Sequence, residues 1–484
     1  MLGACLKTAF RHPKPSLQSF WNYAQLGLLI FPLSPFFGAV GIVLASLGTW
    51  IAQYRTIIRR PLNWGFALLS VLLIITAGFA YDKTAAFLGL FNFLPYFIVF
   101  AGFNALIQTP AQLRQLSWIL VFSSLPVVIL GFGQLFLDWS IKIRILWFVV
   151  EWDIEPGGQP LGRMASIFMY ANILAGYLMI VFILGLGLWV ESYRRIRGQT
   201  NSKFKIQNSK LGVSSSSRPS TPSSLSPDLN SKFKIQNSKL GVSSSSPHLT
   251  LLFLTMAVIA NFVALILTDS RNAWAIAIFA CLAYTLYEGW RILVAGVAGI
   301  ATSVLLAAFA PSPVAQLFRK VVPAFFWARL NDQMYPDRPV ALLRKTQWQF
   351  ALSLAGQRLW TGWGLRNFTL LYQAKMDVWL GHPHNLFLMV FAETGFPTAL
   401  LFCGLLVWIF IAGVQLLRKS QHIEEAEDKL IFFSYLLVFV CWVLFNTADV
   451  SLFDFRLNTL SWLLFSAISG VAYRYNQYER LQVR

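Results

Sequence analysis

The sequence has few charged residues and few cysteines. Charged residues make up 12% of the 484 positions, whereas hydrophobic residues make up 56%. Soluble domains carry about a quarter charged residues, so this composition excludes an ordinary soluble domain and favours a membrane protein. The four cysteines are widely spaced and form no CxxC pair, so neither a disulfide framework nor a cysteine-based metal site is indicated.

Acidic residues are particularly scarce, with 20 Asp and Glu against 39 Lys and Arg, which gives a net charge of +19. No nucleic-acid recognition motif accompanies this charge, and most of it lies in short segments between apolar runs. Basic residues in such segments orient membrane proteins, so we expect membrane lipids and no nucleic acid as partners. Residues 1–20 lack a cleavable signal pattern, so the first apolar segment is expected to stay in the protein.

Long apolar runs dominate the rest of the chain. A membrane helix needs about 20 mostly apolar residues. Clear runs occupy 64–81, 86–107, 114–137, 165–190, 249–268, 291–310, 430–448 and 452–473. The run 272–287 is shorter and the run 386–417 is longer, but each suits one span. The sequence therefore predicts an all-α polytopic membrane protein.

Residues 21–53 form either one long helix or two short helices around Pro32–Pro35. Proline interrupts helices, and two helices bring the total to about twelve. Both termini and the basic loops 54–63, 191–248 and 418–429 then share the cytoplasmic side. One helix would instead separate the basic N-terminus from Arg55, Arg59 and Arg60, so the positive-inside rule favours the hairpin.

This count divides the chain into five parts. They are helices 1–6 at 1–190, a basic cytoplasmic loop at 191–248, helices 7–9 at 249–310, a large external loop with short helices at 311–385, and helices 10–12 with a cytoplasmic tail at 386–484. The loop 191–248 contains the segment NSKFKIQNSKLGVSSSS twice, at 201–217 and 230–246. Its low hydrophobicity predicts disorder, and the role of the duplication is left open.

Polar residues of chemical interest gather on the predicted external side. They lie in loop 138–163, in turn 268–272, in loop 311–385, around Asp449, and near Asp454 and Arg456. Loop 311–385 is strongly basic, and guanidinium groups match phosphate oxygens in geometry and charge. Within it, Asp337 and Pro339 predict a helix start, with a break at Gly356 and a tight turn at Gly362–Gly364. Arginines at a membrane surface also contact lipid headgroups, so an anion site and simple solvation both stay open.

The segment from His382 to Asn385 carries two of the five histidines. A His-Pro-His pair can bind a metal, but no third ligand is evident in the sequence, so we expect no metal. A histidine near neutral pKa can instead act as a general base or position a hydroxyl. His384 suits this role better than His382, because the helix starting at Asn385 should fix its direction.

Two polar residues are expected inside the bundle. Glu393 lies about two helical turns after His384, and a carboxylate in lipid faces a cavity or packs against another helix. Asn172 follows Arg163 and suits an interhelical hydrogen bond. The complete set of candidate residues is Arg163, Asn172, Ser270, Arg271, Arg344, Arg358, His382, His384, Asn385 and Glu393.

Four segments, in this order, resemble the O-antigen ligase and polymerase family of membrane glycosyltransferases. They are Arg163–Leu178 with Phe168 and Asn172, Leu267–Trp274 with Ser270 and Arg271, Arg344–Trp348 followed by Gly362–Phe368, and His382–Leu388 with Ala392–Gly395. The last segment is the most specific. Asn272 departs from the pattern, because the family commonly has glycine there, and the insertion 191–248 is also unusual.

The resemblance implies a GT-C-like fold in the bacterial inner membrane with cytoplasmic termini. It also implies transfer of a glycan from a polyprenyl diphosphate, usually undecaprenyl, to an acceptor hydroxyl, without metal or cofactor. By matching motif, Arg163, Arg271 and Arg344 would neutralise the leaving diphosphate, and His384 would orient or deprotonate the acceptor.

Two other functions stay open. A branch of the family is labelled as inorganic-carbon (bicarbonate) transporters, and a non-catalytic scaffold would tolerate loss of the external arginines. Transporters place polar, broken helices near the midplane in related halves, a pattern that this sequence lacks. The sequence does not distinguish a ligase from a polymerase, and it identifies neither the sugar, the acceptor nor the oligomeric state.

Overall fold

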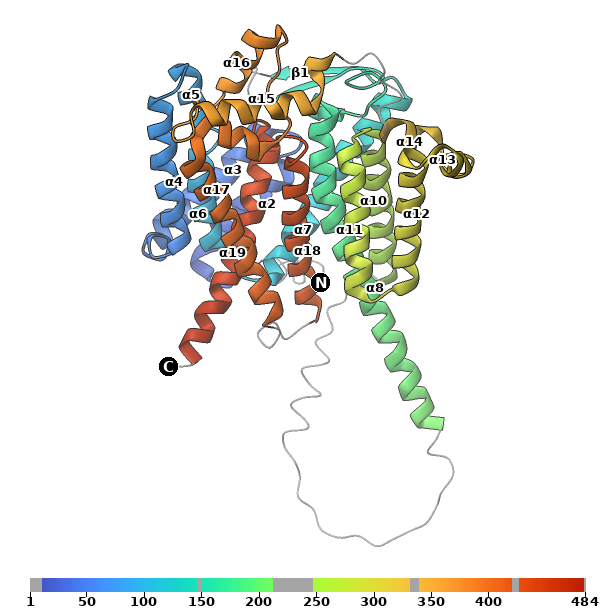
Figure 1. The fold of residues 1–484 in the computed structure, drawn as a ribbon. Helices are drawn as coiled ribbons and strands as arrows, with labels where there is room; N and C mark the ends of the chain where they lie inside the picture. Colours follow the sequence, from blue (N-terminus) through green and yellow to red (C-terminus); the bar gives the residue numbers. More distant parts are fainter. Residues whose placement is uncertain (1–10, 146–149, 212–246, 331–338, 420–425, 483–484) are drawn as a thin grey trace, which may run out of the picture.

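The computed structural model describes residues 11–145, 150–211, 247–330, 339–419 and 426–482, and these are almost entirely helical (Figure 1). The first half forms η1 (Pro15–Leu17), α2 (Gln18–Ile30), α3 (Pro35–Ile58), α4 (Pro61–Gly78), α5 (Lys83–Leu90), α6 (Leu94–Leu106), α7 (Pro110–Phe136), η2 (Ser166–Phe168) and α8 (Ala171–Leu211). The second half forms α10 (Pro247–Leu267), α11 (Arg271–Glu288), α12 (Arg291–Phe309), α13 (Ser312–Arg319), α14 (Ala324–Leu330), η3 (Val340–Leu342), α15 (Arg344–Gln357), α16 (Asn367–Met376), α17 (Leu386–Arg418), α18 (Ala426–Asn446) and α19 (Phe455–Gln482).

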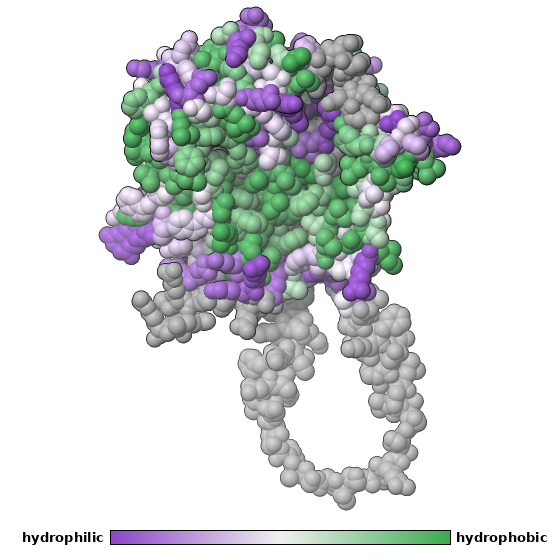
Figure 2. All heavy atoms as spheres, viewed as in Figure 1, coloured by the Kyte–Doolittle hydropathy of each residue, from purple (hydrophilic) through white to green (hydrophobic). Residues whose placement is uncertain are grey.

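The predicted class, an all-α polytopic membrane protein, is confirmed. In the described ranges, nine helical segments are long and apolar enough to cross a membrane. The helices α2, α11 and α19 lie in the other three predicted spans but are not among these nine, so the count of about twelve stays a prediction. On the face shown in Figure 2, hydrophobic side chains cover the middle of the molecule, and hydrophilic ones gather toward its two ends.

The hairpin expected at residues 21–53 is present. The helices α2 and α3 pack against each other, and the chain reverses between Ile30 and Pro35. Proline occupies the start of α3, where its missing N–H costs no helical hydrogen bond and its fixed φ suits a helix.

The elements between the spans divide between two ends of the bundle. One end carries a two-stranded antiparallel sheet, β1 (Ile141–Ile145) and β2 (Val150–Ile154), together with α13, α14, α15 and α16 (Figure 1). We call this the site end. The opposite end carries the extension of α8 beyond the bundle and the C-terminus. The segments predicted to be external thus gather at one end.

The structure differs from the predictions in three places. The loop 138–163 contains the sheet of β1 and β2, which was not predicted. In loop 311–385 the helix begins at Arg344 and ends at Gln357, because Val340–Leu342 form a separate 3₁₀ turn; the predicted start at Asp337 lies outside the described residues.

The third difference concerns the loop 191–248, whose first part is helical rather than disordered. The helix α8 continues to Leu211, and residues 212–246 lie outside the described ranges. Ion pairs explain the start of the extension: Glu191 lies 2.7 Å from Arg114 and 2.5 Å from Arg195, and Arg194 lies 2.5 Å from Glu288. These contacts fix the first turns of α8 beyond the apolar run.

Candidate functional site

At the site end, several segments that are distant in sequence enclose one small polar cavity. Its volume is about 180 Å³, and it is lined by Arg163, Tyr170, Asn172, Asp269, Ser270, Arg271, Asn272, Leu342, Arg344 and His384. Six of the ten candidate residues from the sequence are in this lining. Three of the lining residues are arginines and one is an aspartate, so positive charge is in excess among them.

Helix N-termini add to this positive charge. Arg271 and Arg344 are the first residues of α11 and α15, and Asn172 is the second residue of α8. A helix N-terminus carries about half a positive charge, so an arginine there is unfavourable unless an anion binds nearby. Arginines at converging helix N-termini therefore form a suitable site for an anion with several charges.

The loop before α8 holds Arg163 in place by close backbone contacts. Gln159 N–H donates to the Arg163 carbonyl oxygen over 3.0 Å. Gly158 has a φ of +88°, and a Cβ there would lie 2.0 Å from the same carbonyl oxygen, so only glycine fits. Arg163 Nε then donates to the Thr268 carbonyl oxygen over 2.9 Å, which connects this loop to the turn before α11.

Hydrogen bonds extend from Arg163 across the cavity wall to the histidines. Arg163 Nη2 donates to Asn172 Oδ1 over 2.5 Å, and Asn172 Nδ2 donates to Asp449 Oδ2 over 3.1 Å. Asp449 Oδ1 lies 3.4 Å from His384 Nδ1. Asn172 therefore connects an arginine of the preceding loop to a carboxylate–imidazole pair whose carboxylate lies in the turn between α18 and α19, whereas the sequence suggested a hydrogen bond between helices.

His384 is held in an unusual backbone conformation. Its φ is +51°, a region that costs a non-glycine residue about 1–3 kcal/mol unless the surroundings enforce it. Asn385 accepts a hydrogen bond from Leu388 N–H and caps α17, and its Nδ2 donates to the Thr447 carbonyl oxygen over 3.0 Å. These bonds fix the turn so that the His384 ring meets Asp449 and lines the cavity.

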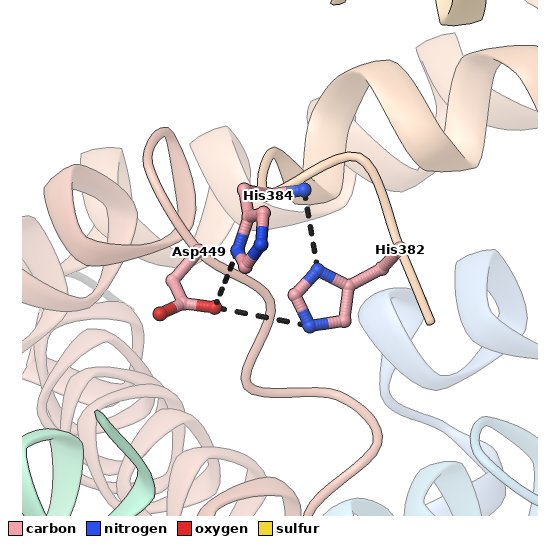
Figure 3. A group of neighbouring side chains, drawn as sticks. All are labelled: His382, His384 and Asp449. Atoms are coloured by element: carbon pink, nitrogen blue, oxygen red, sulfur yellow. Dashed lines mark hydrogen bonds and ion pairs between the residues drawn. The ribbon is translucent and has the colours of Figure 1, made fainter. Parts of the chain in front are cut away.

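His382 lies beside the same carboxylate (Figure 3). Its Nε2 is 3.9 Å from Asp449 Oδ1, its Nδ1 accepts the His384 backbone N–H over 3.2 Å, and its ring stacks on Phe453. Burial lowers the pKa of His382 to about 4, so its ring is neutral at pH 7. For Asp449, burial by itself would raise the pKa, but hydrogen bonding from His384 and the neighbouring imidazoles outweigh it and the pKa is lowered.

The two histidines and Asp449 bring three possible metal ligands within 4.8 Å of one another. Asp449 supplies the third ligand that the sequence did not show. The donor set suits a divalent cation by type, but the adjoining cavity carries three arginines. Repulsion from these charges opposes cation binding, and the same carboxylate is used to position His384.

The other four candidates do not line the cavity. His382 and Asn385 support His384 as described above. Arg358 donates to the Phe79 carbonyl oxygen over 3.2 Å, and its Cζ lies 4.0 Å from the Trp363 ring centroid. Glu393 is buried, and its Oε1 accepts the Phe368 N–H over 3.1 Å at the start of α16.

The Glu393 side chain therefore serves to hold the start of α16 against α17. At the predicted turn Gly362–Gly364 the backbone approaches α17 closely: Gly364 N–H donates to the Glu393 carbonyl oxygen over 2.7 Å, and a Cβ on Gly362 would lie 2.4 Å from that oxygen. These contacts support the break in α17 at Gly395.

Asp449 is the main site residue that the sequence did not place among the candidates. It lies in the turn between α18 and α19, far in sequence from every other member. The only sequence feature that pointed to Asp449 as a site residue was its position in a predicted external turn. Asn272, where the family commonly has glycine, donates from Nδ2 to the Phe445 carbonyl oxygen over 2.9 Å, so its side chain is accommodated.

Residues 256–403 match a family model described as O-antigen ligase. The match runs from α10 into α17, and it includes Ser270, Arg271, Arg344 and His384 but not Arg163, Asn172 or Asp449. No curated protein matches the chain. Over these residues the match supports the family resemblance carried by the motifs, whereas inorganic-carbon transport receives no support.

Proposed function

Because the chain carries an O-antigen ligase domain at residues 256–403, we propose that it is a glycosyltransferase that takes a glycan from a polyprenyl-diphosphate donor. The acceptor is a hydroxyl group on the outer side of the bacterial inner membrane. The observation that carries the proposal is the convergence of Arg163, Arg271 and Arg344 on one cavity at the site end.

In this proposal the cavity binds the diphosphate. The donor's diphosphate gains negative charge as its bond to the sugar breaks, and fixed cations that await this charge lower the barrier. The three arginines and the helix N-termini supply such cations without rearrangement. Ser270 adds a hydroxyl at the start of α11, where it can donate to a phosphate oxygen.

His384 is proposed to accept the proton of the acceptor hydroxyl. If Nδ1–H donates to the Asp449 carboxylate, the other ring nitrogen, Nε2, carries the lone pair. The hydroxyl oxygen then forms a bond to the anomeric carbon, the bond from that carbon to the diphosphate oxygen breaks, and the bonding electron pair leaves with the diphosphate. The proton passes to Nε2, and Asp449 stabilises the imidazolium that results.

An apolar groove suits the donor's hydrocarbon chain. It has a volume of about 250 Å³, it lies between α17 and α18, and side chains such as Phe387, Val407 and Phe439 line it. Phe387 follows His384 by three residues, so the groove begins next to the polar site. A polyprenyl chain in this groove would leave its diphosphate beside the arginines.

A reconstituted transfer assay tests the proposal. We expect proteoliposomes with the wild-type protein to transfer glycan from a lipid-diphosphate donor, with or without a chelator, and His384→Ala to lose most of this activity. His248→Ala, which changes an exposed histidine at the start of α10, is the matched control. Unchanged transfer by His384→Ala would contradict the assigned base.

Cysteine labelling tests the side of the membrane. In a variant without the native cysteines, Leu161→Cys at the site end should react with a membrane-impermeant reagent added outside the cell. Arg418→Cys, at the end of α17 that lies away from the site, should react only after permeabilisation. The reverse pattern would place the cavity on the cytoplasmic side and would exclude the proposed donor.

A further inference from the structure

A second cavity lies at the opposite end of the bundle, away from the arginines of the site. It has a volume of about 280 Å³ and is bounded by the turn between α3 and α4, by Asn104 of α6, and by the C-terminal parts of α17 and α19. Most of its lining is apolar, including Leu62, Trp408 and Ile409, and polar groups occur at Arg59, Arg60, Asn476 and Gln477.

Arg60 in this lining is a buried cation. Only 3% of its surface is exposed, and its Cζ lies 4.2 Å from the centroid of the Tyr473 ring. Its Nη1 donates to the Asn104 carbonyl oxygen over 2.6 Å and also to Asn104 Oδ1. Its Nε has no hydrogen-bond partner among the described residues.

The contacts of Arg60 are neutral oxygens and an aromatic ring, and no described carboxylate pairs with it. The sequence explains part of this, because the first acidic residue of the chain is Asp82. The carbonyl groups at the end of α6 offset part of the charge, since a helix C-terminus is partly negative. A buried charge without an ionic partner is costly, so the site favours an anion.

Two further features add positive charge at the same place. Arg59 is exposed and lines the cavity next to Arg60. The helix α4 begins at Pro61, so its N-terminus, which attracts phosphate groups, also borders the cavity. Trp408 and Tyr473 are of the residue types that gather where a membrane meets water.

We propose that this cavity binds an anionic glycerophospholipid of the leaflet at the opposite end. The phosphodiester group lies against Arg59 and the start of α4, with the charge of Arg60 behind it. The first part of an acyl chain lies along the apolar surface formed by Leu62, Ile409 and Ala412. The proposal does not depend on the glycosyltransferase function, because no residue is shared with the site.

Native mass spectrometry of the purified full chain with added lipid tests the proposal. Phosphatidylglycerol should bind at one tight site, about tenfold more strongly than phosphatidylcholine with the same acyl chains, because both lipids carry an anionic phosphodiester but Arg59 and Arg60 repel the quaternary ammonium of choline. Arg59→Gln and Arg60→Gln should each remove most of this preference. Arg55→Gln is the matched control, because Arg55 is exposed one turn earlier and does not line the cavity.

A steric variant tests the apolar part of the site. Ala412→Trp fills the cavity without changing charge and should weaken phosphatidylglycerol binding about as much as Arg59→Gln. Millimolar inorganic phosphate should not compete with the lipid. Equal binding of the two lipids, or equal binding by all variants, would overturn the proposal. Competition by phosphate together with no effect of Ala412→Trp would do so as well, since it would indicate an anion site without a lipid chain.

Discussion

Two groups of arginines, one at each end of the bundle, are arranged in different ways. At the opposite end, Arg114, Arg194 and Arg195 each contact a carboxylate, on Glu191, Glu288 or Glu427. These pairs connect α7, α8, α11 and α18. At the site end, three arginines surround a cavity whose lining includes one aspartate, and two of them begin helices, where a cation is unfavourable.

The difference indicates what each group is for. The arginines at the opposite end each contact at least one carboxylate of a neighbouring helix, so they hold helices together without a ligand. The three arginines at the site end instead line one cavity, and two of them stand at helix N-termini, so their positive charges converge on a space that can hold an anion.

The largest expected effect separates the two groups by their role in glycan transfer. Arg271→Ala should lower the rate of transfer by about 10²–10³, as loss of one fixed group that stabilises developing charge usually does. Arg195→Ala, at the opposite end, should change the rate by less than about threefold, because its partly exposed ion pairs stabilise the protein only weakly. If Arg271→Ala and Arg195→Ala lowered the transfer rate equally, the two groups of arginines would not differ in their role in transfer.

A smaller effect is expected for Asp449→Asn. The amide keeps the shape of the side chain but loses the charge that positions His384 and stabilises its protonated form. We expect a loss of about 10- to 100-fold in kcat, with little change in KM, because substrate does not contact this residue in the proposal. If the change appeared only in KM, Asp449 would act in binding instead.

At the opposite end, Glu191→Gln should affect stability rather than transfer. Glu191 is buried and contacts both Arg114 and Arg195, so its loss leaves two cations without that partner. Arg114 and Arg195 keep Asp428 and Glu427 as partners, so we expect a loss of about 1–3 kcal/mol in the free energy of unfolding, seen as a lower Tm in detergent. Transfer at a temperature where the variant is folded should stay near the wild-type rate.

The smallest effect concerns pH and His382. Burial holds the pKa of His382 at about 4, whereas an unfolded histidine has a pKa of about 6.5, so the unfolded chain binds the proton first. Stability should therefore be complete above pH 6.5 and decline as the pH falls toward 4, by at most about 2 kcal/mol at pH 5. The Tm of His382→Asn should fall less between pH 7.5 and pH 5 than that of wild type or of His248→Asn.

Much of the fold followed from the sequence because membrane helices are identified by length and apolarity alone. The hairpin of α2 and α3 followed from two prolines and the distribution of basic residues. The same counting of spans placed turn 268–272, loop 311–385 and the His382–Asn385 segment at one end, and the structure has them there.

The remaining features depend on tertiary contacts that leave little local signal. Nothing in the sequence around Asp449 indicates that this aspartate contacts His384, because the two residues are 65 positions apart. Glu393 and Arg358 have the residue types of a catalytic site, but their partners are a backbone N–H and a backbone carbonyl. The extension of α8 rests on ion pairs with α7 and α11, which no property of the segment itself predicts.

Binding of a diphosphate to the site-end cavity is the most direct test of the account. Purified wild-type protein should bind farnesyl diphosphate, measured by isothermal titration calorimetry, and should bind the corresponding alcohol at least tenfold more weakly. Arg271→Gln should weaken diphosphate binding to a similar degree, and Arg195→Gln should leave it unchanged. Equal affinity of wild type and Arg271→Gln for the diphosphate would contradict the claim that these arginines hold the leaving group.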